Sequence, residues 1–546
     1  MAITSLPFAL FVIITAIIYF AFPMKNYRWV ILLIASSFFY FYNSFRYSAF
    51  ILISIITIYL AACKIDSIND ETKAFLKSKK EEWSRDERKA YKEKANGRRK
   101  TLLAVTLIFN FGILFLLKYF NFLSGSIASM MGSSAESAPQ IHLLLPLGIS
   151  FYTFISTGYL IDVYRETVKP EKNIFKFALF VSFFPQIIQG PISSFAKLHD
   201  QLIAPHDLSW LNFKQGVMNI FWGLFKKLVV ADTAWIAIKA YYAHGGINGT
   251  EDFKAYGGTM VLAISLLYAL QLYADFSGGI DISRGICRIL GIDLEVNFRQ
   301  PYFSKSIGEY WRRWHITLGA WMKNYVFYPI AMSGFSAKIS KGIAASGFGK
   351  TVVGKHISKV LMTAVASFIV FLLVGIWHGA NSKYIGFGVW NGFIIMLSAM
   401  LGPVYEKTRN TLHIKENAAW WQLFQMIRTF IIVLIGYIFD IADNFTNAIQ
   451  MMQVILFDQN KALFMEQLKS LGLRKIHYLA IIFGALLMLY ISIRLEKTSL
   501  DTPGELLEKR CGLIQWLALL ALIMSILLLG TYGPAYEAAE FIYKGF

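Results

Sequence analysis

The sequence has little charge. Only 16% of its 546 residues are Asp, Glu, Lys or Arg, whereas 56% are hydrophobic and the mean hydropathy is +0.49. Soluble domains carry about 25% charged residues, so this composition excludes an ordinary soluble protein. Three cysteines are too few for a disulfide scaffold. We therefore expect an all-α polytopic membrane protein that places about 20 residues in each span.

Signatures of the common catalytic and binding classes are also absent. The sequence has no Gly-x-Ser-x-Gly, no P-loop, no His-Glu-x-x-His and no nucleic-acid-binding motif. We therefore predict no metal site and no nucleic-acid partner. It also has no internal repeat, which weakens a transporter interpretation because many transporters contain two related halves.

Hydrophobic runs dominate what is present. They predict about eleven transmembrane helices, together with re-entrant and interfacial helices. Pro185, Gly190 and Pro191 interrupt one run, which is typical of a broken or re-entrant segment shielded from lipid. Because no basic residue or small-residue cleavage site accompanies the first run, we interpret it as a span, not a removed signal peptide. The runs are 6–22, 29–42, 48–62, 101–120, 142–161, 174–190, 216–240, 259–274, 360–377, 384–402, 427–441, 478–493 and 513–530.

The net charge of +19 is concentrated in short segments between these runs. Residues 64–100 carry 13 Lys/Arg and 8 Asp/Glu, residues 299–323 carry 5 and 1, and residues 335–360 carry 5 Lys and no acid. Short basic loops mark the cytoplasmic side of a membrane. Facing anionic lipid is a second effect of such loops.

Orientation follows from the first long loop, which we expect to be a solvated cytoplasmic helix at residues 64–100. Three spans precede it, so we predict a multi-pass protein of the cell membrane with an extracytoplasmic N-terminus. Residues 121–141 contain Glu136 and no Lys or Arg, as an external loop should, and residues 162–176 are basic again.

His378 is the first candidate for chemistry. It follows the apolar run 360–377, and Gly375 and Gly379 flank it, so that backbone or a ligand can approach closely. An ionisable side chain at membrane depth is a functional hypothesis by default. Neutral imidazole is the natural general base for a hydroxyl near pH 7. The alternative is a histidine that ends a helix at the membrane interface.

His315 is the second candidate. Ser306 and Glu309 form a capping-box pattern, which predicts a helix that continues to about Tyr328, where Pro329 stops it. The spacing then places four residues on one helix face: Trp311, His315, Leu318 and Met322. An interfacial helix is the alternative.

Two acidic residues follow the apolar run 259–274. Asp275 and Asp281 are six residues apart and no histidine joins them, which is poor spacing for a metal site. We interpret them as buried, hydrogen-bonded carboxylates that hold the fold.

Together these segments resemble the membrane-bound O-acyltransferase family. Trp377-His378-Gly379 at the end of an apolar run, with Arg313-Trp314-His315 upstream, carries the resemblance. It extends strongly from about residue 145 to 400, within a single expected membrane domain of residues 1–546. The supporting segments are 184–191, 270–278, 297–302 and 540–543.

Within that family the chain looks most like the bacterial polysaccharide branch, and in particular its alginate-acetylating type. The Phe-Pro-Gln at 184–186 and the Trp-Arg-Arg-Trp-His at 311–315 carry this likeness. One departure is Val389-Trp390-Asn391-Gly392, where relatives often have Tyr-His-Gly.

The resemblance implies a ring of helices around a central tunnel. It makes His378 the catalytic histidine and His315 the second functional histidine, either orienting the donor or stabilising the oxyanion. Arg312, Arg313 and Trp314 become candidates for donor binding, and a second group, Asp275, Trp377 and Gly379, for structural or tunnel-lining positions.

The implied reaction is O-acylation of an extracytoplasmic cell-surface polysaccharide. The implied donor is a cytoplasmic thioester, acetyl-CoA or an acyl carrier protein, with no further cofactor. The implied partners are an esterase-like acetyltransferase outside the cell and membrane lipid. The alternatives are D-alanyl transfer to teichoic acid, a polysaccharide or lipid transporter, and a lipid-linked glycosyltransferase. The last is disfavoured because residues 43–47 contain no acid.

Overall fold

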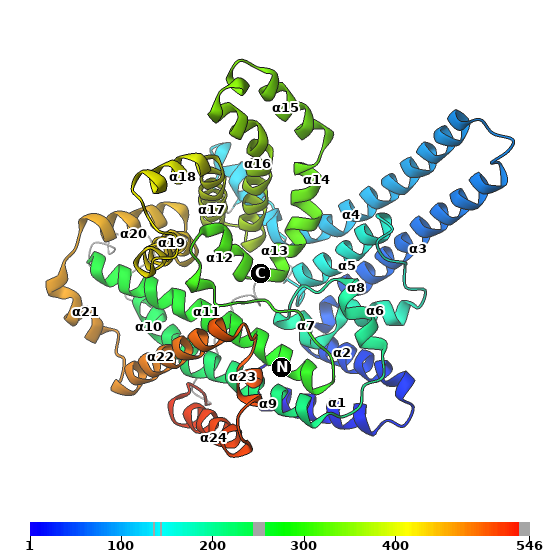
Figure 1. The fold of residues 1–546 in the computed structure, drawn as a ribbon. Helices are drawn as coiled ribbons and strands as arrows, with labels where there is room; N and C mark the ends of the chain where they lie inside the picture. Colours follow the sequence, from blue (N-terminus) through cyan, green and yellow to red (C-terminus); the bar gives the residue numbers. More distant parts are fainter. Residues whose placement is uncertain (135–136, 142–144, 244–256, 534–546) are drawn as a thin grey trace. The chain divides into compact units, whose positions relative to one another are not determined.

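The structure is a computed structural model that describes residues 1–134, 137–141, 145–243 and 257–533 (Figure 1). Within these ranges the secondary structure is helical, apart from one isolated antiparallel bridge between Phe298 and Trp314. The prediction of an all-α polytopic membrane protein is confirmed. In the described part, seven helical stretches are long and apolar enough to span a membrane: Lys25–Ser78, Arg85–Met130, Gly258–Ile289, Val352–His378, Ala419–Ile441, Lys475–Thr498 and Gly512–Leu529.

These candidate spans are fewer than the eleven expected. An eighth arises if the bent pair α17 (Ser382–Met400) and α18 (Gly402–Thr411) counts as one span. The predicted runs 29–42 and 48–62 fall within a single helical stretch, and α1 (Leu6–Ala21) has only 16 residues. At 1.5 Å per residue such a helix is about 24 Å long, less than the hydrocarbon core of about 30 Å. The span count, the ring and the tunnel remain predictions.

The chain divides into two compact units, and the prediction of a single domain is left open. The first unit contains Met1–Val217 and Ser283–Glu295, and the second contains Met218–Ile282 and Val296–Lys544. The helices that lie entirely within the first unit are α1 and α2 (Arg28–Ser44), α3 (Ser48–Ser78), α4 (Arg85–Met130), α5 (Ile149–Tyr164), α6 (Ile174–Ser182), α7 (Phe184–Gln189) and α8 (Phe195–Ile203).

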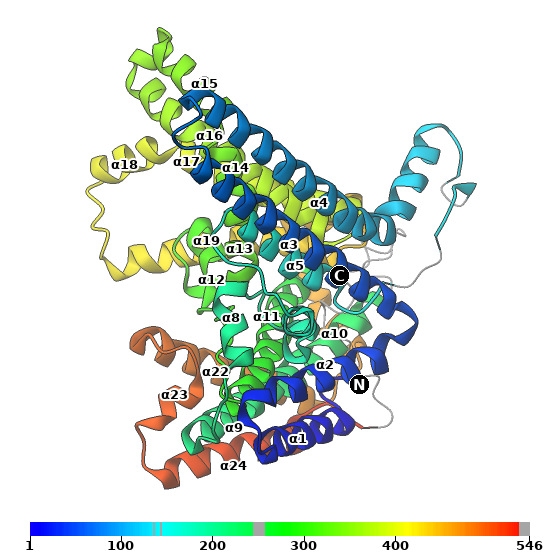
Figure 2. The ribbon, with the colours of Figure 1, turned by 90° about the vertical axis from the view of Figure 1, so that its right-hand side faces the viewer.

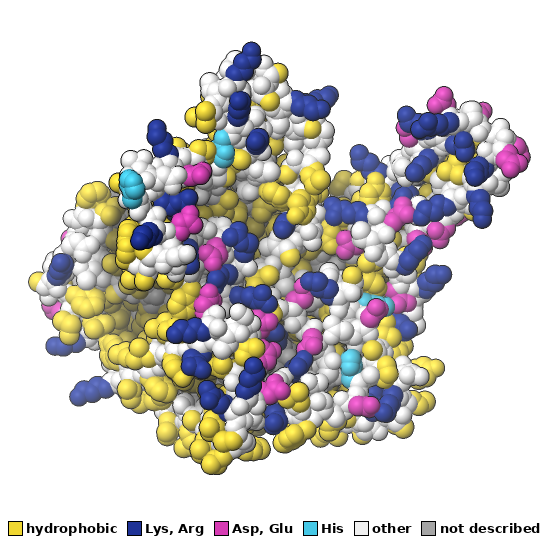
Figure 3. All heavy atoms as spheres, in the orientation of Figure 1, with side chains coloured by type: hydrophobic (Ala, Val, Ile, Leu, Met, Phe, Trp, Pro, Cys, Tyr) yellow, Lys and Arg dark blue, Asp and Glu magenta, His cyan; other side chains and the backbone are white. Residues whose placement is uncertain are grey.

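In the first unit, α3 and α4 run side by side as a long hairpin (Figure 1). Ser84 begins α4 with a complete capping box, in which its hydroxyl accepts from Glu87 N–H and the Glu87 carboxylate accepts from Ser84 N–H. The ends of the hairpin carry basic and acidic side chains together (Figure 3). Residues 64–100 are thus helical as predicted, but they form two helices joined by a turn.

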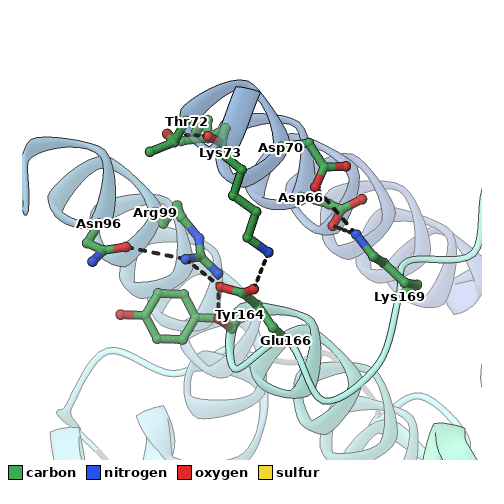
Figure 4. A network of polar contacts seen from close by, with 10 residues as sticks. Asp66, Asp70, Thr72, Lys73, Asn96, Arg99, Tyr164, Glu166 and Lys169 are labelled. Atoms are coloured by element: carbon green, nitrogen blue, oxygen red, sulfur yellow. Dashed lines mark hydrogen bonds and ion pairs between the residues drawn. The ribbon is translucent and has the colours of Figure 1, made fainter. Parts of the chain in front are cut away.

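Ion pairs connect this hairpin to the segment after α5 (Figure 4). Lys169 Nζ lies 3.1 Å from Asp66 Oδ1, and the Glu166 carboxylate pairs with both Lys73 and Arg99. The hydrogen bond from Lys73 lowers the pKa of Glu166 to about 2. The two segments that we predict to be cytoplasmic, 64–100 and 162–176, therefore contact each other.

The segment rich in Pro and Gly is broken, as its sequence predicts. Helix α6 ends at Ser182, Phe183 is non-helical with ψ 113°, and α7 restarts with Pro185 in its first turn. Pro lacks an N–H, and it is tolerated at that position because the first amides of a helix have no internal partner.

In the second unit, α16 (Val352–His378) and α17 form an antiparallel hairpin, and α15 (Gly334–Ala345) packs against α16 (Figure 2). Basic side chains without acidic neighbours stand out around α15 in Figure 3. The other helices that lie entirely within this unit are α10 (Asp232–Ala243), α12 (Ile307–Arg313), α13 (Ile316–Met322), α14 (Tyr328–Ala331), α18 (Gly402–Thr411), α19 (Ala419–Ile441), α20 (Phe445–Phe457), α21 (Phe464–Ser470), α22 (Lys475–Thr498), α23 (Pro503–Glu508) and α24 (Gly512–Leu529).

Two helices extend from one unit into the other along the chain, α9 (Trp210–Leu224) and α11 (Gly258–Ile289). The core of the second unit includes the π-helical segment Phe225–Ala231 that follows α9. Gly223 lets the backbones approach there, because a Cβ at this position would lie 2.5 Å from the Gly278 carbonyl oxygen of α11. This close packing positions the polar side chains described below.

Candidate active site

His378 is the last residue of α16, and its side chain is buried. Three aromatic rings surround the imidazole: the ring centroids of Trp377, Tyr384 and Phe387 lie 5.3, 6.0 and 5.1 Å from it. The histidine is 8% exposed. These rings shield most of the imidazole from solvent.

The flanking glycines bring α17 close to His378. A Cβ at Gly375 would lie 2.3 Å from the Tyr384 carbonyl oxygen, and a Cβ at Gly379 would lie 2.4 Å from the Tyr384 ring. The sequence analysis predicted close approach of backbone or ligand at these positions. In the structure it is α17 that occupies the space.

His315 does not lie inside a helix, so that part of the sequence analysis is wrong. Helix α12 begins at Ser306 as predicted, but it ends at Arg313, and His315 has a left-handed backbone with φ 45°. The chain is then continuously helical from Ile316 to Ala331 through α13, a π-helical segment and α14, so the helix continues past Pro329 and ends two residues after it.

A neighbouring strand-like segment causes the break. Arg299 N–H donates to the Arg313 carbonyl and Ile316 N–H donates to the Asn297 carbonyl, each at 3.0 Å, around the bridge between Phe298 and Trp314. These bonds replace the i to i−4 bonds of a continuous helix. Periodicity could not show this competition, because the partner segment has no helical or strand pattern of its own.

The structure brings the two predicted histidines into one buried environment within the second unit. The Trp377 ring centroid lies 6.1 Å from that of His315 and 5.3 Å from that of His378. His315 is 3% exposed and also packs edge-on against Phe276 at 4.8 Å. The short helices around His315 are not candidate spans. Burial, with a smaller contribution from His378, lowers the pKa of His315 to about 3, so its imidazole is neutral at physiological pH.

Asn297 holds the other side of His315, and the sequence analysis missed its role. This asparagine is 0% exposed, and its Oδ1 lies 3.2 Å from His315 Nδ1. The same oxygen accepts from Thr317 N–H at 3.1 Å and from Thr317 Oγ1 at 2.9 Å. Sequence reasoning noticed Asn297 only as part of a family motif, because nothing local connects it to a residue 18 positions away.

The three residues proposed for donor binding occupy different environments. Trp314 is 3% exposed and packs among aromatic rings, with Phe298 at 5.0 Å and Tyr310 at 5.8 Å. Arg312 and Arg313 instead line a polar pocket of about 460 Å³. The structure therefore separates the tryptophan from the two arginines.

Charges in this polar pocket are balanced, with three arginines and three carboxylates among its lining residues. Arg313 pairs with Glu496 at 2.7 Å and with Glu309 at 2.8 Å, and Arg299 pairs with Asp501. Arg312 is exposed and forms no ion pair with any residue that the structure describes. It is the arginine of this pocket that is available to an incoming anion.

Asp275 and Asp281 belong to a buried ion network, in which the sequence analysis overlooked the cationic partners. Lys227 Nζ lies 2.6 Å from Asp275 and 2.8 Å from Asp232, and Lys226 Nζ lies 2.6 Å from Asp281. Two lysines inside the apolar run 216–240 are a signal that could have identified them, since charges at membrane depth need partners. No group of metal-binding side chains occurs in the described part of the chain.

Comparison with known proteins gives a consistent result. Residues 168–345 match the model of the membrane-bound O-acyltransferase family. The chain is 35% identical over 344 residues to a probable alginate O-acetylase of Pseudomonas syringae pv. tomato, covering 63% of this chain and 58% of that protein. The chain thus spans about 60% of the length of the alginate O-acetylases that it matches.

Two further relatives are named for other acceptors, peptidoglycan and teichoic acid. A peptidoglycan O-acetyltransferase of Helicobacter pylori is 27% identical over 458 residues, covering 79% of this chain and 74% of that protein. A teichoic acid D-alanyltransferase of Bacillus subtilis is 25% identical over 308 residues, covering 55% of this chain and 69% of that protein.

The tail 540–543 that supported the resemblance lies outside the described residues.

Proposed function

We propose that this chain, which belongs to the membrane-bound O-acyltransferase family through residues 168–345, transfers an acyl group to hydroxyls of a cell-surface polysaccharide. The observation that carries the proposal is the pairing of two buried imidazoles across one tryptophan ring, with His378 at the end of a candidate span. The alginate and peptidoglycan O-acetyltransferase names of its relatives favour acetyl as the acyl group.

The chemistry needs a base and an activated acyl donor. A thioester is already activated, so a covalent enzyme intermediate is not required. In the proposed step His378 takes the proton of the acceptor hydroxyl while that oxygen forms a bond to the thioester carbonyl carbon. The C–S bond then breaks, and the leaving thiolate takes up the proton. General-base assistance of this kind contributes about 10²–10⁴-fold in rate.

The donor is a cytoplasmic acetyl thioester such as acetyl-CoA, or an acyl carrier protein, and no other cofactor takes part. Arg312 supports this proposal more strongly than Arg313, because the Arg313 guanidinium is already bound by two carboxylates. A phosphate oxygen would form charge-assisted hydrogen bonds with the Arg312 guanidinium.

The location and partners form part of the same proposal. The chain is a multi-pass protein of the cell membrane with its N-terminus outside. An esterase-like acetyltransferase on the extracytoplasmic side is its partner in O-acylation of the polysaccharide.

D-alanyl transfer is the second candidate, and the teichoic acid D-alanyltransferase relative is the observation that favours it. The two candidates differ in the ester that reaches the cell surface and in the donor, a carrier protein for D-alanine. Mass spectrometry of surface polysaccharide, with and without the gene, identifies the ester and the sugar.

The catalytic assignment is tested with His378→Ala and a matched control on the same helix, His356→Ala. His356 lies near the other end of α16, where its Nε2 contacts the Ala399 carbonyl. We expect His378→Ala to abolish surface esterification at normal protein level and membrane insertion, because the run 360–377 supplies the span without it. His378→Gln should be nearly as inactive, since an amide cannot accept the proton.

Full ester content in cells that express His378→Ala at the wild-type level would refute the catalytic assignment. It would favour the transporter alternative. The His356→Ala control should retain wild-type ester content, and a loss there would show that the assay reports folding of α16.

A further inference from the structure

The side chain of Asn297 determines how His315 can act. We infer that Asn297 is a positioning residue that holds His315 in the tautomer with the proton on Nδ1, so that Nε2 is a hydrogen-bond acceptor. The inference rests on three contacts to one oxygen, Asn297 Oδ1, and its consequence for catalysis rests on the proposed function.

The first step is the orientation of the Asn297 amide. A backbone N–H can only donate, and Thr317 N–H points at the side-chain atom of Asn297 that is 3.1 Å away. That atom must therefore be the carbonyl oxygen, because the reversed amide would place NH₂ against another donor. The opposite atom, Nδ2, is buried and has no hydrogen-bond partner among the described residues.

The second step is the tautomer. Asn297 Oδ1 is an acceptor, so His315 Nδ1, at 3.2 Å, must carry the proton to form the bond. In a neutral imidazole the other nitrogen then carries the lone pair. The left-handed backbone at His315 presents the ring to Asn297, and the bond from Ile316 N–H to the Asn297 carbonyl keeps the two segments together.

The third step concerns the reaction. An oxyanion needs a donor, and a neutral His315 with its only proton bound to Asn297 offers none at Nε2. The family resemblance leaves open whether His315 orients the donor or stabilises the oxyanion. The geometry favours the orienting role and disfavours oxyanion stabilisation. His315 holds a proton-bearing group of the substrate through its Nε2 lone pair, and it does not stabilise the oxyanion.

The direct test measures the tautomer in the whole protein. Protein labelled with ¹⁵N-histidine is placed in lipid bilayers, and protonated and unprotonated ring nitrogens are distinguished by ¹⁵N NMR. His315→Gln identifies the His315 signals by their loss. We expect Nδ1 protonated and Nε2 unprotonated, whereas a proton on Nε2 in the wild-type protein would overturn the inference.

Variants of Asn297 test whether this residue sets the tautomer. Asn297→Asp keeps an acceptor oxygen and should keep the proton on Nδ1, whereas Asn297→Leu should allow the proton to move to Nε2. The control is Asn391→Leu, since Asn391 is 2% exposed and its side chain hydrogen-bonds to Trp311 and to the Phe387 carbonyl, with no hydrogen bond to a histidine among the described residues. An unchanged His315 spectrum in Asn297→Leu would refute the positioning role.

The activity readout separates positioning from general stability. Asn297→Leu should lower kcat by roughly tenfold or more with little change in the donor KM, because a misplaced proton affects the chemical step. If this variant does not fold, the wild-type spectrum still decides the tautomer, and Asn297→Ala replaces Asn297→Leu as the test of positioning. The NMR measurement of the tautomer does not require catalytic turnover. Its result is therefore independent of whether the proposed acyltransferase activity is correct.

Discussion

Gly375 offers a sharp test of how packing supports the candidate site. In Gly375→Ala the new Cβ would begin 2.3 Å from the Tyr384 carbonyl oxygen and 2.9 Å from the Gly388 backbone. Carbon–oxygen contacts settle at about 3.3 Å or more, so α16 and α17 must separate by about 1 Å. Overpacking of this kind costs about 1–3 kcal/mol. Displacing a reacting group by about 1 Å can cost about 10²-fold in rate.

The matched control is Gly342→Ala in α15, where a Cβ would meet no heavy atom within 4 Å. Ala is favoured over Gly in a helix by about 1 kcal/mol, so this variant should be as stable as wild type or slightly more so. The assay measures surface ester per cell together with the melting midpoint of the purified protein in detergent. Wild-type ester content and melting in Gly375→Ala would refute the argument that this glycine sets the distance between α16 and α17 beside His378.

Three further outcomes are expected. Arg312→Lys should raise the donor KM, because Lys cannot bind a phosphate in a bidentate manner. Arg313→Lys should mainly lower the melting midpoint. An unchanged KM for Arg312→Lys would exclude a role of Arg312 in donor binding. Lys227→Met should lower the free energy of unfolding by about 3–5 kcal/mol, since it leaves two buried carboxylates without their shared cation, and a melting midpoint equal to wild type would contradict this. A topology reporter fused within 64–100 should be cytoplasmic and one within 125–138 external, and the reverse pattern would discard the predicted orientation.

Local patterns in the sequence predicted the elements well where one segment decides its own conformation. The predicted capping residue Ser306 begins a helix in the structure, and the Pro/Gly-rich segment is broken at Phe183. The same approach failed at His315, where a helical period continues through a residue that is not helical. A pattern measures what a segment favours alone, and it is outweighed there by two hydrogen bonds, from Ile316 N–H to the Asn297 carbonyl and from Arg299 N–H to the Arg313 carbonyl.

The candidate site shows the same division. A histidine at the end of an apolar run is unusual enough to make His378 a candidate from sequence, because burying an ionisable group is costly. Its pairing with His315 across Trp377 is a long-range contact that only the folded second unit reveals. The arginines were indistinguishable in the sequence, and the structure separates them by which carboxylates lie within reach.

Composition and short-range order thus determined by themselves that this chain is helical and suited to a membrane, because hydrophobicity and capping act over neighbouring residues. The tertiary structure alone decided which nitrogen of His315 carries the proton, which arginine remains available, and which lysines neutralise Asp275 and Asp281. Each of these depends on distances of about 3 Å between residues far apart in the chain. A linear pattern does not contain those distances, since they arise only when the helices pack.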